Sequence, residues 1–107
     1  AIEHLQEAVR LRPDYADAYF NLGTVFFQQS RIDQAIAQWQ KALAIRPRDA
    51  EAHRSVASAL RKQGNVKEAI AEYEQALNIT PEDSMALNNL AWAQSQKAAE
   101  QRSKSNR

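Results

Sequence analysis

Apolar residues recur along this chain with a fixed period of 34 residues. A step of that length connects the three prolines, Pro13, Pro47 and Pro81. The same step aligns apolar residues in sets of three: Ile2, Ile36 and Ile70; Val9, Leu43 and Leu77; Leu22, Val56 and Leu90. A period of this length is typical of proteins built from stacked structural repeats, in which each repeat contacts its neighbours.

Each period holds two segments whose apolar residues have helical spacing. The predicted helices cover residues 2–11, 15–29, 32–45, 50–63, 66–79, and 84 to about 100 or beyond. Proline separates successive periods because it disfavours helical geometry in the residue before it and donates no backbone hydrogen bond. The turn at Gly64 is expected to be more favourable than its counterpart at Ser30, since glycine adopts left-handed backbone without a steric penalty. After the last helix the chain is expected to fray through Ser103, Lys104, Ser105, Asn106 and Arg107.

Polar side chains near two helix starts are candidates for helix caps. Asp14 or Asp17 is expected to serve the free amides at the start of the second helix. Asn65 and Glu68 have the spacing of a capping box at the start of the fifth.

One stretch of the chain holds an unbroken series of aromatic, small and proline residues: Tyr19, Leu22, Gly23, Phe26, Ala35, Trp39, Ala42 and Pro47. This series resembles the tetratricopeptide repeat, a helix-turn-helix unit, in residue type and in spacing. In the next repeat His53 and Ala57 replace the aromatic residue and the glycine, while six positions keep the pattern: Val56, Leu60, Ala69, Tyr73, Ala76 and Pro81. A third repeat begins with Leu87, Leu90 and Ala91, then departs from the pattern at Gln94 and Ser103.

The resemblance extends from residue 1 to about residue 97 and implies an all-α fold, a right-handed superhelical stack of antiparallel helix pairs. It divides the chain into the second helix of a partial repeat (1–12), two repeats (15–47 and 49–81), the first helix of another partial repeat (83–102) and a frayed tail (103–107). Because the chain starts inside a repeat and without Met, we expect it to be part of a longer protein.

Composition and residue spacing favour no catalytic, metal or cofactor site. Two glycines cannot form a glycine-rich phosphate-binding loop, and the lack of cysteine excludes thiol catalysis and disulfides. His53 lies near Ser55 and Ser58, but residues two apart on a helix point away from each other, and a third orienting group is missing. A net charge of +1 predicts no attraction to nucleic acid or membrane. We expect a protein that is not an enzyme, binds no cofactor and lies in the cytoplasm.

In proteins that this chain resembles, the first helix of each repeat lines a concave groove that holds a peptide or a partner helix. The peptide-binding residues implied here are Phe20, Asn21, Thr24, Phe27, Arg54, Ser58, Arg61, Asn88, Asn89 and Trp92. The same face also includes Asp17, Glu51, Ser55, Lys62 and Met85. Aromatic rings would supply apolar contact, arginines would bind carboxylates, and asparagines would bond a peptide backbone. The alternative is that the rings pack between helices and the bases form a solvated face.

Two functional classes stay open. The favoured one is a non-catalytic module that binds a protein or peptide segment, and the other is a substrate-recruiting array of a larger enzyme such as a protein glycosyltransferase. The clamp for the acidic C-termini of heat-shock chaperones is not present, because its basic and amide positions are occupied by Phe20, Thr24, Ser55, Met85 and Asn89. Unpaired helices at both ends favour self-association, end to end or by helix swapping, unless the polar extension after Gln94 keeps the chain monomeric.

Overall fold

The structure is a computed structural model that describes residues 2–105, and within them it consists of helices joined by short turns. The helices are α1 (Ile2–Leu11), α2 (Ala16–Gln28), α3 (Ile32–Ile45), α4 (Ala50–Lys62), α5 (Val66–Ile79) and α6 (Ser84–Ser105). The predictions for α1, α3 and α5 are confirmed residue for residue, and those for α2 and α4 are one residue too long at one or both ends. Helix α6 continues to Ser105, which was expected to lie in a frayed tail, and residues 106 and 107 lie outside the described residues.

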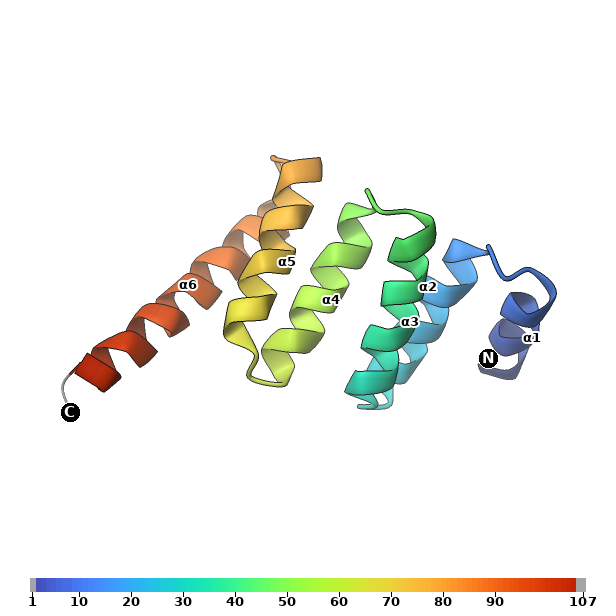
Figure 1. The fold of residues 1–107 in the computed structure, drawn as a ribbon, viewed down its shortest axis with the longest axis horizontal. Coiled ribbons are helices and arrows are strands. Elements are labelled where there is room, and N and C mark those ends of the chain that lie inside the picture. Colours follow the sequence, from blue (N-terminus) through green and yellow to red (C-terminus); the bar gives the residue numbers. More distant parts are fainter. Residues whose placement is uncertain (1, 106–107) are drawn as a thin grey trace.

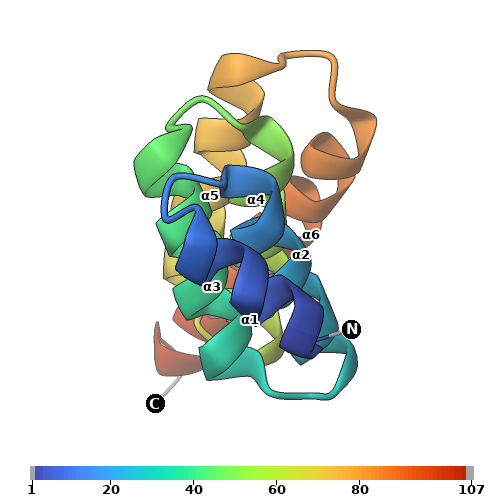
Figure 2. The same ribbon diagram turned by 90° about the vertical axis from the view of Figure 1, so that its right-hand side faces the viewer.

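The helices stack in chain order along the long axis of an elongated molecule, with the two ends of the chain at opposite ends of the stack (Figure 1). Helices α2 and α3 form one antiparallel pair and α4 and α5 form the next, while α1 packs against α2 and α6 against α5. Viewed along the stack, α3 and α5 lie on one side and α2 and α6 on the other (Figure 2). The molecule measures 55 × 28 × 18 Å. Its main contacts join helices that follow one another in the chain, as in a solenoid.

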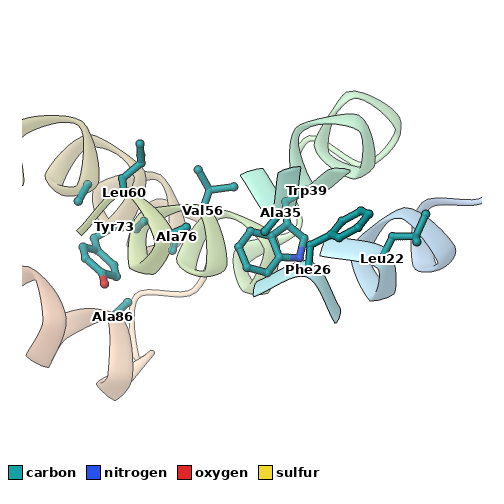
Figure 3. Packing of buried hydrophobic residues seen from close by; sticks show 12 residues of the cluster. Leu22, Phe26, Ala35, Trp39, Val56, Leu60, Tyr73, Ala76 and Ala86 are labelled. Carbon is teal, nitrogen blue, oxygen red and sulfur yellow. The ribbon is translucent and has the colours of Figure 1, made fainter. Parts of the chain in front are cut away.

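Buried side chains form a continuous cluster through both helix pairs (Figure 3). Half of its buried members are alanines, which let the helices approach closely. Trp39 and Tyr73 are the largest members, 3% and 0% exposed, and each belongs to the second helix of its pair. Trp39 covers Gly23, where an added methyl group would lie 2.8 Å or less from three atoms of the indole ring. The absence of a side chain at Gly23 therefore makes room for the indole ring from α3.

The helix starts differ from the sequence prediction at two places. Tyr15 is the N-cap of α2 and makes no side-chain cap bond, while the carboxylate of Asp17 accepts from Arg46 Nη1 at 2.9 Å. At α5 the capping box is wrong, because the Asn65 side chain makes no cap bond and donates to Gln63 Oε1 instead, at 3.3 Å. At Asp17 the guanidinium of Arg46 competes with the backbone amides as a donor, and at Asn65 the rotamer that donates to Gln63 makes no cap bond.

The two turns inside the helix pairs share left-handed backbone geometry. Gly64 has φ +83° and Ser30 has φ +63°. A serine in this region carries a steric cost that glycine avoids. The prediction that the turn at Gly64 is the more favourable one is consistent with this geometry.

Candidate functional site

The first helices of the repeats share one face, and a cavity of about 350 Å³ opens on it. Its lining residues are Phe20, Thr24, Phe27, Trp39, Glu51, Arg54, Ser55, Ser58 and Met85. Those from α2 and α4 recur at steps of three or four residues, which places them on one side of each helix. The cavity therefore lies across α2, α4 and the start of α6, with Trp39 of α3 at its base.

Three aromatic rings form the apolar part of the cavity. The ring centroids of Phe20 and Phe27 lie 6.3 Å and 5.7 Å from that of Trp39, both tilted by about 40°. Trp39 is held in place by its Nε1–H, which donates to the carbonyl oxygen of Phe20 at 3.0 Å. Phe20 and Phe27 are half-buried: both rings pack against the core and also line the cavity.

The polar part of the cavity is supplied by α4 and the start of α6. Arg54 Nη1 donates to Asp83 Oδ2 at 2.7 Å, and Asp83 Oδ1 accepts from the amide of Ala86 at 3.2 Å. Burial by itself raises the pKa of Asp83, but the bonds from Ala86 and Arg54 outweigh it and hold that pKa below its ordinary value. From the sequence, Arg54 is expected to bind a carboxylate of the ligand, but Asp83 of this chain already occupies that role.

A second group of contacts lies one helical turn beyond the cavity. The guanidinium of Arg61 stacks on Trp92 at 4.0 Å from the ring centroid, and its Nη1 donates to Asn89 Oδ1 at 3.2 Å. The neighbouring Lys62 places its ammonium 5.3 Å from the Phe27 ring centroid. These contacts join the end of α4 to α6 on one side and to α2 on the other.

The ten residues proposed from sequence fall into three groups in the structure. Five line the cavity: Phe20, Thr24, Phe27, Arg54 and Ser58. Three form the group at the end of α4: Arg61, Asn89 and Trp92. Asn21 and Asn88 are exposed and lie outside the cavity lining. Trp39 also lines the cavity, although it is not among the binding residues expected from the sequence, because the 34-residue pattern does not reveal this contact.

The alternative of nucleophilic catalysis gains no support from the position of His53. Its Nδ1 lies 2.8 Å from Glu72 Oε1 and its Nε2 lies 2.9 Å from the carbonyl oxygen of Pro47. Both ring nitrogens are therefore engaged away from Ser55 and Ser58. In the described part of the chain, no three His, Asp or Glu side chains gather in a way that could hold a metal ion. None of the described helices is long and apolar enough to cross a membrane.

Comparison with protein families identifies repeats over almost the whole chain. A model described as tetratricopeptide repeat matches residues 25–84, more than half of the chain, and also residues 57–101. A second model, described as TPR repeat, matches residues 1–30. A comparison with curated proteins gave no match.

Solved structures with the same arrangement include two crystal structures of MamA. Both are 29% identical to this chain and cover 91% of it, with TM-scores of 0.88 and 0.86. The chain spans 57% and 53% of the MamA chains, little more than half their length. The Arabidopsis OM64 TPR domain has a TM-score of 0.84 at 24% identity, covers 89% of this chain and is itself covered over 78%, a similarity that shows the fold.

Proposed function

Because this chain belongs to the tetratricopeptide repeat family, whose fold is a scaffold for protein interactions, we propose that it binds an extended segment of a partner protein in the groove that α2, α4 and α6 form. The observation that carries the proposal is the cavity between Phe20, Phe27, Trp39 and Met85. Its volume is that of a small ligand site, enough for one large apolar side chain. Recruitment of substrates to a catalytic domain elsewhere in a longer protein would use the same groove.

The cavity combines the features of a binding hot spot. Aromatic rings offer apolar area at a small entropic cost, because packing on Trp39 already restricts Phe20 and Phe27. Polar side chains at the rim, Arg54 and Ser58, can orient the backbone of a bound segment. An apolar residue of the partner would fill the cavity, and its neighbours would lie along the groove.

Thr24→Arg tests the cavity by filling it with a long charged side chain. We expect peptides selected from a random library on the intact chain to lose at least about tenfold in affinity, measured by fluorescence anisotropy. Asn21→Arg is the matched control, since it adds the same side chain to the same helix at an exposed position outside the lining. Equal affinities of the Thr24→Arg variant and the unmodified chain would rule out the cavity as the site.

Apolar side chains that α6 leaves partly exposed support self-association through the end helices, end to end or by helix swapping. Leu22 and Val56 are 2% and 3% exposed, whereas their equivalent Leu90 on α6 is half-buried and Leu87 is 48% exposed. In the two complete pairs, the second helix of the repeat covers Leu22 or Val56. Helix α1 of another copy, which is itself the second helix of a repeat, could cover Leu90 in the same way. This contact is heterologous and would form open chains unless it closes. Light scattering over a concentration series should show mass rising above 12.1 kDa, and a constant mass would refute self-association.

A further inference from the structure

The cationic side chains along the groove differ in whether a carboxylate of this chain pairs with them, and those without such a partner among the described residues lie at the end of α4. Arg46 and Arg54 are each paired with a carboxylate of this chain, Asp17 and Asp83. Among the described residues no carboxylate pairs with Arg61 or with Lys62. This end of the groove therefore carries positive charge that is available to a ligand.

Arg61 is also held in a fixed position. Its guanidinium plane is stacked on Trp92, and one of its N–H groups is bonded to Asn89. A guanidinium has five N–H donors, so further donors remain for a ligand, and a carboxylate can accept two of them together. Because stacking and the Asn89 bond already restrict the side chain, binding a carboxylate costs less entropy than it would at a free surface arginine.

We propose that the groove recognises a segment with an apolar side chain and, at a fixed distance from it in the sequence, an aspartate or glutamate, which binds Arg61. This inference rests on the proposed function, because the apolar side chain occupies the cavity described above. Arg61 is three residues beyond Ser58 and seven beyond Arg54, so it lies on the same side of α4 as the cavity lining. On α6, Asn89 and Trp92 are four and seven residues beyond Met85 and share its side in the same way.

The helix geometry fixes the spacing of the two recognised side chains. Seven residues of α4, from Arg54 to Arg61, span about 10 Å at 1.5 Å per residue. An extended peptide that runs along α4 covers about 3.3 Å per residue, so the acidic residue should lie about three positions from the apolar one. Lys62, beside Phe27, adds positive charge at the same level and strengthens the preference for an acid.

Arg61 has a second role that the experiment must separate from ligand binding. It lies in the last turn of α4, together with Lys62, where a positive charge stabilises the helix end. Its loss should lower stability slightly whether or not it binds a ligand. Thermal unfolding by circular dichroism must therefore accompany each affinity measurement.

The test uses the intact chain and acetylated, amidated nine-residue peptides with Leu at the fifth position. The second and eighth positions, each three residues from Leu, are Glu in one pool and Gln in the other, with mixed residues elsewhere. We expect the Glu pool to bind about tenfold more tightly than the Gln pool, and less so as salt rises. In Arg61→Gln this difference should vanish. In Arg61→Lys, which keeps the charge and loses the planar fork, part of it should remain.

Arg12→Gln is the matched control, because Arg12 also stacks on an aromatic ring, Tyr15 at 4.8 Å, but lies between α1 and α2. It should leave the difference between the pools unchanged. Equal binding of both pools to the unmodified chain, or a difference that persists in Arg61→Gln, would overturn the inference while leaving the groove as a peptide site. Failure of both pools to bind would overturn the proposed function as well. So would a Thr24→Arg variant that binds the pools as tightly as the unmodified chain does.

Discussion

The two complete helix pairs have the same fold but fill its central space with different residues. In the α2–α3 pair Trp39 lies on Gly23, and in the α4–α5 pair the equivalent residues are Tyr73 and Ala57. All four are buried (Figure 3 shows the two aromatic rings). The larger ring occurs with the smaller partner, so the two positions are coupled by volume, as expected for a core packed to crystal-like density.

The polar atoms of the two rings are satisfied in different ways. Trp39 donates to the backbone carbonyl of Phe20, a bond that any residue at position 20 would allow. Tyr73 shares a hydrogen bond with the hydroxyl of Ser58 at 3.3 Å, and Ser58 lines the cavity. The hydrogen bond of Trp39 thus involves no groove side chain, whereas that of Tyr73 does.

Gly23→Ala is the strongest test of the volume coupling. The new methyl group would overlap the indole of Trp39, and overpacking of this kind costs about 1–3 kcal/mol. We expect a value of about 3 kcal/mol from urea unfolding, because both residues are buried and in contact. Ala57→Gly should cost only about 1 kcal/mol, the penalty of glycine within a helix.

A second substitution shows whether the cause is overlap with the ring. In Gly23→Ala with Trp39→Tyr, the first pair acquires the residues of the second, so the double variant should be more stable than the sum of the two single changes predicts. Additive costs would mean that the two pairs are built on different backbones and that the coupling is not one of volume.

The repeat pattern predicted this core well because the pattern is itself a record of packing. Pro47 and Pro81 fix where helices end, and the small residues at Gly23, Ala35 and Ala69 mark close contacts between helices. These features are local in sequence or repeat at a constant step. The ends of α1, α3 and α5 therefore followed from spacing alone.

The site was harder to predict because its contacts join residues far apart in the sequence. Arg54 and Asp83 are 29 residues apart, and so are Arg46 and Asp17. Pattern reasoning placed Arg54 on the groove but could not show that its partner was internal. The failed capping box at Asn65 has a related cause, since a side-chain rotamer decides between the backbone and Gln63.

The turns are expected to give the next largest difference in stability between the two helix pairs. Gly64→Ala puts a side chain at φ +83° and should destabilise by about 1–2 kcal/mol, although open space surrounds the position. Ser30→Gly removes the same cost from the first pair, and a gain of about 0.5–1 kcal/mol is expected after the loss of glycine entropy. Thermal unfolding of both variants measures this, and a Ser30→Gly variant less stable than the parent would show that the serine side chain contributes there.

The starts of α4 and α6 differ in their electrostatics. Asp49 accepts a bond from the amide of Ala52, whereas Asp83 accepts one from the amide of Ala86 and also pairs with Arg54. Since asparagine also caps helices, Asp83→Asn removes mainly the ion pair and should cost about 1 kcal/mol near neutral pH. Asp49→Asn is the matched control and should cost less.

The pKa of Asp83 sets the pH range of this effect. That pKa is lower in the folded chain than in the unfolded chain, where it is about 3.9. The stability that Asp83 contributes is therefore complete above the unfolded pKa and is lost as pH falls through the folded pKa. Urea unfolding from about pH 7 down to about pH 2 should show the parent and Asp83→Asn converging in acid. A gap that stays constant over this range would assign the cost to lost packing.

Tyr73→Phe should have the smallest effect, about 0.5 kcal/mol, because its hydroxyl bond to Ser58 is long and half-buried. Ser58→Ala breaks the same bond from the other side and also changes the cavity lining. If the two hydroxyls interact, the double variant should be no less stable than the less stable of the two single variants. Calorimetry of the parent, both single variants and the double variant measures that coupling.

Only Ser58→Ala should alter peptide affinity if the groove contacts the ligand at this position. An equal change in Tyr73→Phe would mean that the ring positions Ser58, and that the core of the second pair helps to shape the site.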